Sequence, residues 1–103
     1  MKDNLRIFAS FSTALSLDAI CSKLNSKLTV RLKHDHCSLR AEGIDLQLSE
    51  CGPREFLMRG EAESVNQLQD LLIAQLHNIS DDLHMDIFEE DGRLVKRIYS
   101  ENN

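Results

Sequence analysis

One stretch in the second half of the chain constrains the fold more than any other, because its apolar residues recur at helical spacing. They form a single broad stripe, preceded by Ser64, which is suited to cap a helix N-terminus. The stripe consists of Val65, Leu68, Leu71, Leu72, Leu76 and Ile79. A helix that is apolar along one side must bury that side against a second layer. The flanking segments predict that this layer is a β-sheet.

The segments before this helix alternate apolar and polar residues, which is typical of strands. We predict strands over 5–12, 28–32, 37–41, 44–50 and 55–60, and a first helix over 17–24 that is capped by Ser16. Val30 and Leu32 are expected in the core. Glu42-Gly43 fits a two-residue hairpin loop, which would set Arg40 opposite Asp45.

A last hairpin is predicted after the second helix, because alternation over 83–87 is followed by Asp91-Gly92, a strong type I′ turn signal. That turn would set Glu90 opposite Arg93 and Asp86 opposite Arg97. The predicted order is therefore β-α-ββββ-α-ββ in one domain over 1–103, with a polar tail at 101–103. The fold class is an α+β two-layer sandwich with an antiparallel-rich sheet and two helices on one face. Its nearest topology is a ferredoxin-like plait with extra strands.

Charge is distributed unevenly along the chain, although the overall net charge is only −5. Residues 1–40 carry a net charge of +4 and residues 41–103 a net charge of −9, and no Lys or Arg occurs between Arg59 and Arg93. We expect this acidic C-terminal half to dock a basic macromolecular partner. The alternative is a solvated face that only keeps the protein soluble. The candidate partner-binding residues are Asp81, Asp82, Asp86, Glu89, Glu90 and Asp91.

The cysteines and histidines suggest a second kind of site. Because three cysteines are an odd number, they cannot form a closed set of intramolecular disulfides. We therefore expect reduced thiols in a cytoplasmic protein. His34, His36 and Cys37 are residue types that bind zinc, and Cys51, His77 and His84 could join them, although the spacing matches no known zinc module. The alternative is a polar turn with Cys37 in the core.

No catalytic motif or phosphate-binding glycine loop occurs, so we expect no enzyme activity. The acidic balance also makes nucleic acid an unlikely partner, even if Phe8 and Phe88 lie on the face of the sheet away from the helices. No apolar run is long enough to span a membrane. The leading hypothesis is a non-enzymatic protein-binding or regulatory module, such as an inhibitor, an immunity-type protein or an adaptor. The alternative is a homo-oligomeric ligand- or metal-binding domain that self-associates through the sheet and uses the His34/His36/Cys37 cluster.

Overall fold

The computed structural model describes residues 4–25 and 28–101. Within these residues, seven strands and two helices follow one another in the predicted order. Glu101, which was predicted to begin the polar tail, is the last residue of the final strand, and residues 102–103 lie outside the described part. The second helix is continuous but is divided into three segments, α2, η1 and α3. The elements are β1 (Leu5–Ser12), α1 (Leu17–Leu24), β2 (Thr29–Leu32), β3 (His36–Ala41), β4 (Ile44–Gly52), β5 (Glu55–Ala62), α2 (Val65–Leu68), η1 (Gln69–Ile73), α3 (Ala74–Ile79), β6 (Asp82–Phe88) and β7 (Leu94–Glu101).

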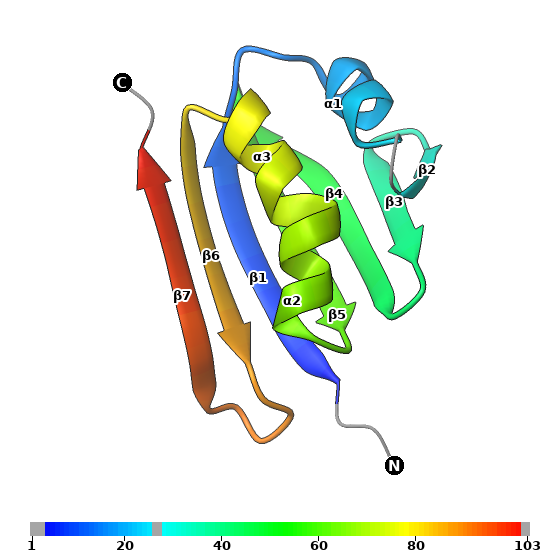
Figure 1. Cartoon of the computed structure of the whole chain (residues 1–103). Coiled ribbons are helices and arrows are strands. Elements are labelled where there is room, and N and C mark those ends of the chain that lie inside the picture. The colour runs from blue at the N-terminus through cyan, green and yellow to red at the C-terminus, as the bar shows by residue number, and fades with distance from the viewer. Residues whose placement is uncertain (1–3, 26–27, 102–103) are drawn as a thin grey trace.

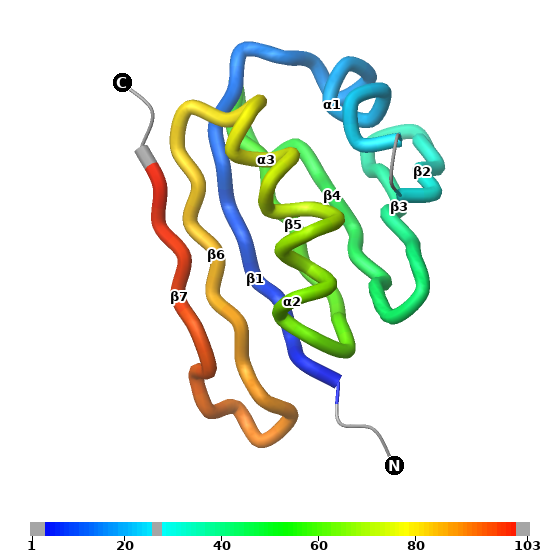
Figure 2. The backbone as a smooth tube through the Cα atoms, in the orientation of Figure 1, coloured from blue at the N-terminus to red at the C-terminus, as the bar shows by residue number. Residues whose placement is uncertain are grey.

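The strands form one antiparallel sheet in the order β2-β3-β4-β5-β1-β6-β7. Both helices lie in front of the same face of this sheet, and the other face is open (Figure 1). The molecule is thus an α+β fold, as predicted. β1 runs through the middle of the sheet between β5 and β6, and β7 forms one edge (Figure 2).

The core lies between the helices and the covered face of the sheet. In β1 the side chains of Ile7, Ala9 and Phe11 are buried, while those between them are more exposed, as period-2 alternation requires. Leu72 and Leu76 pack onto this layer from the second helix. No helix in the described ranges is long and apolar enough to cross a membrane.

The predicted register of the β3–β4 hairpin is confirmed. Arg40 pairs with Asp45, and Cys37 pairs with Leu48. Gly43 has φ +78°, a conformation that glycine adopts without the cost a side chain would bring. The short loop therefore fixed the pairing along the whole hairpin.

The prediction for the β6–β7 turn was wrong at its tip. Glu89, not Glu90, faces Arg93, since the Glu89 N–H donates to the Arg93 carbonyl at 2.8 Å and the Gly92 N–H donates to the Glu89 carbonyl at 2.9 Å. The loop therefore has three residues and a positive-φ Gly92, the usual alternative to the two-residue turn. An irregularity between Ile87 and Phe88 then shifts the register back by one residue, so Asp86 does pair with Arg97.

The second helix departs from the predicted regular α-helix through a π-helical segment, η1. The wider turn changes which side chains face the sheet, so Ile73 is buried and Leu71 is only partly buried. The uninterrupted stripe predicted Leu71 and missed Ile73.

Leu32 was also predicted wrongly. It is 47% exposed, and Val30 is partly buried. β2 is a four-residue strand at the edge of the sheet, with a neighbouring strand on only one side. Alternation alone cannot distinguish such a strand from a central one.

Candidate functional site

The six carboxylates predicted to bind a partner lie at both ends of β6 and in its middle. Asp81 and Asp82 are at the start of the strand, and Glu89, Glu90 and Asp91 follow its end. A strand of this length separates its two ends by about 20 Å. The predicted set therefore does not form one compact patch.

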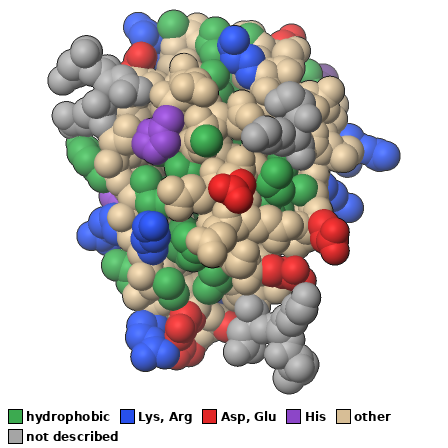
Figure 3. Space-filling model, viewed as in Figure 1, with side chains coloured by type: hydrophobic (Ala, Val, Ile, Leu, Met, Phe, Trp, Pro, Cys, Tyr) green, Lys and Arg blue, Asp and Glu red, His purple; other side chains and the backbone are tan. Residues whose placement is uncertain are grey.

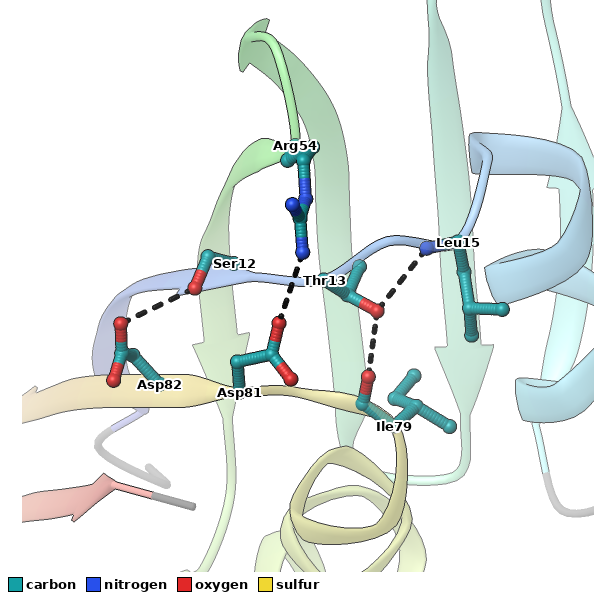
Figure 4. Close-up of polar contacts among 7 residues, drawn as sticks. All are labelled: Ser12, Thr13, Leu15, Arg54, Ile79, Asp81 and Asp82. Atoms are coloured by element: carbon teal, nitrogen blue, oxygen red, sulfur yellow. Dashed lines mark hydrogen bonds and ion pairs between the residues drawn. The ribbon is translucent and has the colours of Figure 1, made fainter. Parts of the chain in front are cut away.

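At the start of β6 the carboxylates take part in a junction between three segments of chain (Figure 4). Arg54 Nη2 lies 3.5 Å from Asp81 Oδ2, and the Ser12 hydroxyl donates to Asp82 at 3.3 Å. Beside them the buried Thr13 hydroxyl donates to the Ile79 carbonyl at 2.6 Å. These contacts join the end of β1 to the start of β6, so Asp81 and Asp82 already have intramolecular partners.

Asp86, in the middle of β6, is held on the open face of the sheet. Arg97 Nε donates to Asp86 Oδ1 at 2.8 Å, and His84 Nε2 lies 3.1 Å from the same oxygen. The hydrogen bond from Arg97 lowers the pKa of the Asp86 carboxyl most, partial burial opposes this, and His84 lowers the pKa further. The Asp86 charge is thus balanced within the protein.

The carboxylates beyond the end of β6 lie in the β6–β7 loop. This loop, the β3–β4 loop and the start of α2 all lie at the same end of the molecule, the lower one in Figure 2. The Glu63 N–H donates to the Gly43 carbonyl at 2.8 Å, which holds the β3–β4 loop against the start of the second helix. Acidic side chains are visible at the lower right and lower left of the helix face (Figure 3).

Two adjoining hollows, of about 260 and 590 Å³, open at this end of the molecule. Asn4 lines both of them, which makes them neighbours. No Lys, Arg or His of the described residues lines either hollow. The carboxylates that line them define the acidic end and are Asp45, Glu61, Glu63, Glu89, Glu90 and Asp91.

Three of these carboxylates have arginine partners outside the hollows. Arg93 Nη2 lies 2.7 Å from Glu89 and 3.9 Å from Asp91, and Arg40 Nε lies 3.5 Å from Asp45. Glu61 accepts a hydrogen bond from the Asn4 amide at 3.4 Å. Glu61, Glu63 and Glu90 are exposed to solvent. The sequence pattern placed Glu61 and Glu63 in the stretch without Lys or Arg, but it missed Asp45, which the β4–β5 pairing brings opposite Glu61.

The predicted zinc ligands are not brought together. His36 Nδ1 lies 2.9 Å from Asp35, and this contact with His36 is the main cause of the lowered pKa of the Asp35 carboxyl. Cys37 is the next residue along β3, and its side chain is buried in the core. Within residues 4–25 and 28–101, no three His, Cys, Asp or Glu side chains are grouped so that they could hold a metal ion.

Cys37 instead contacts Cys21 of α1, and their Sγ atoms are 2.7 Å apart. Burial is the largest cause that raises the pKa of both thiols, and together with the contact with Cys21 it raises the pKa of Cys37 to about 12. Cys51 is exposed and lines a hollow beside Ser10 and Tyr99, away from the other two cysteines.

Another hollow, of about 500 Å³, lies on the open face of the sheet. It is lined by Phe8, Leu57, Arg59, His84 and Asp86, among others. The Phe8 and Phe88 rings meet edge to face with centroids 6.0 Å apart. Phe8 is 53% exposed and Leu57 is 49% exposed, so this face combines apolar and charged groups.

Comparisons of the chain with known protein families, with curated proteins and with solved structures find no match.

Proposed function

We propose that this protein is a non-enzymatic, cytoplasmic binding module that docks a basic protein partner through the carboxylates of its C-terminal half. The observation that supports this proposal is the pair of adjoining hollows lined by six carboxylates and by no cationic side chain of the described residues. The partner would insert Lys or Arg side chains into these hollows. An inhibitor, an immunity-type protein or an adaptor would act in this way.

The proposal gives most weight to Glu89, Glu90 and Asp91 among the residues singled out from the sequence, and it adds Glu61 and Glu63. Several carboxylates on one concave surface increase the local concentration of a basic partner and speed its association. Arginine is especially suited to such a site, because its planar donors pair with carboxylates in bidentate geometry. By contrast, Asp81, Asp82 and Asp86 line neither hollow, and their contacts within the protein make a role in maintaining the fold a sufficient explanation for them.

We also interpret the fold as an enlarged ferredoxin-like plait. In the order β4-β5-β1-β6, two helical connections link β1 to the four-strand meander and β5 to β6. β2, β3 and β7 extend this unit at its two edges. The topology implies no particular activity, so the proposed function depends on the acidic end alone.

The test is a titration of the protein with a short Arg/Lys-rich peptide, followed by amide NMR shifts and by the dissociation constant. We expect the largest shifts at Asn4, Gly43 and Gly92, with binding that weakens steeply between low and physiological salt. The double variant E61K/E90K should weaken binding about tenfold or more, equivalent to about 1.4 kcal/mol.

A matched control carries the same change of net charge elsewhere. The double variant E50K/D70K reverses one exposed carboxylate in β4 and one exposed carboxylate on the second helix. It should weaken binding less than about twofold, since both positions lie outside the hollows. Equal losses in the two double variants, or shifts centred on Asp81 and Asp82, would contradict docking at the acidic end.

Self-association through the open face of the sheet is a second candidate, favoured by the exposure of Phe8, Leu57 and the 65% exposed Tyr99. A dimer of this kind would bury these side chains and would be insensitive to salt. Sedimentation of the full chain at two salt concentrations tests it. A monomer at concentrations up to about 100 μM, where even a weak dimer would be detected, would exclude it.

A further inference from the structure

We infer that Cys21 and Cys37 form a reversible disulfide that links α1 to β3 when the protein meets a peroxide. The inference is independent of the proposed partner. It rests on the distance between the two sulfur atoms, on their position in the core, and on the separation of the third cysteine from both.

The fold aligns this pair from two different elements. Cys21 lies on the buried side of α1 with Ile20 and Leu24, and Cys37 points from β3 toward the helix layer. The Sγ atoms are 2.7 Å apart. A disulfide bond is about 2.05 Å long, so closing it needs a further approach of less than about 1 Å.

The location of the pair excludes competing partners. Cys37 is fully buried and Cys21 is 6% exposed, so neither thiol can readily meet a thiol of another molecule. Cys51 is exposed on the opposite face of the sheet. The odd number of cysteines therefore divides into an internal pair and a separate surface thiol, which the count alone did not indicate.

The chemistry requires an oxidant, for which we name hydrogen peroxide. The thiolate of Cys21 attacks one peroxide oxygen, the O–O bond breaks, and a sulfenic acid and one water are produced. The Cys37 sulfur then attacks the Cys21 sulfur and releases a second water. The two thiols lose two electrons and two protons in total, and the peroxide is reduced to two waters. Cys21 reacts first because it is the more exposed of the two thiols, while the pKa of Cys37 is raised to about 12.

The bond would have a measurable effect on stability. It closes a loop between positions that are 16 residues apart. Cross-links over loops of this length raise the melting temperature of a domain of this size by about 10–20 °C. The reduced protein and the oxidised protein should therefore differ clearly in thermal unfolding.

The experiment uses the full chain with C51S, which removes the exposed thiol. After hydrogen peroxide treatment in native buffer, we expect an intact mass about 2 Da lower, a linked peptide containing both cysteines, a higher melting temperature, and reversal of all three by dithiothreitol. C21A and C37A in the same background should show no 2 Da loss.

Three outcomes would overturn the inference. They are gain of oxygen without the 2 Da loss, formation of the bond only in denaturant, and a melting temperature that does not rise on oxidation. The C51S protein alone decides among them, so the inference stays testable even if an alanine variant does not fold.

Discussion

Substituting Gly60 by alanine should strongly destabilise the protein, because the strands of the sheet approach each other closely at this residue. Gly60 lies in β5 and pairs with Leu46 of β4 on one side and Ile7 of β1 on the other. A Cβ atom here would lie 2.2 Å from the Asp45 carbonyl oxygen and 2.8 Å from the Leu46 Cα. Both are backbone atoms, so no side chain can move aside. The two central strands would have to separate.

The magnitude follows from two contributions. Gly60 has φ +156°, which L residues rarely adopt, and such strain costs about 1–3 kcal/mol. Overpacking against a backbone that cannot yield adds about 1–3 kcal/mol. The G60A variant should therefore lose about 2–6 kcal/mol of unfolding free energy, a large part of the total for a small domain.

Urea unfolding followed by circular dichroism measures this loss, and G92A is its matched control. Gly92 also has a positive φ, +94°, but a Cβ there would meet nothing within 4 Å. G92A should therefore lose only the conformational strain, about 1–2 kcal/mol. If G60A loses no more than G92A, the close approach of β4 to β5 does not limit stability and the reasoning is refuted.

Three further predictions concern the core and two titrating groups. L72A should lose about 2–5 kcal/mol in urea unfolding, because Leu72 is fully buried, and a loss below about 1 kcal/mol would contradict its place in the core. The melting temperature should fall at high pH because of the Cys37 thiol. Its pKa is raised from 9.0 to about 12, so the stability gained by keeping this thiol protonated in the folded state is complete below pH 9 and is lost as the pH rises toward 12. C37A should show a smaller decline over that range. The pKa of Asp86 is lowered chiefly by Arg97, so its stabilisation is present at neutral pH and is lost as the pH falls below the usual range of a carboxyl group. D86N should show a shallower acid-induced decline in melting temperature, and parallel wild-type and D86N curves would argue against this ion pair.

The sequence predicted pairings wherever a local turn determines the register. Glu42-Gly43 set Arg40 opposite Asp45 because a two-residue loop leaves no other pairing. Asp91-Gly92 predicted a two-residue turn, but a three-residue loop formed. Asp86 still meets Arg97 because an irregularity in the ladder restores the register. Positions that depend on distant neighbours were missed. Leu32 looked like a core residue until the edge position of β2 was known.

The candidate site was predictable only in part, for a similar reason. Counting along the chain identified a stretch without Lys or Arg. However, β6 separates the acidic residues at its start from those after its end, so the two sets lie at opposite ends of the sheet. The length of that strand could have been used to anticipate the separation. Asp45 could not have been added in the same way, because its place beside Glu61 depends on the pairing of β4 with β5.

The position of β1 in the sheet has a consequence for how the protein folds. β2 to β5 form one local meander and β6 with β7 forms another, and β1 is the strand that joins the two. Its partners lie far along the chain, as Leu5 with Ala62 and Ser12 with Asp82 illustrate. On the ribosome, β1 is synthesised before its two neighbours and must wait unpaired until β5 and β6 have been made. Such long-range pairing is typical of domains that fold in milliseconds to seconds. The step that completes the sheet is therefore the insertion of its earliest strand.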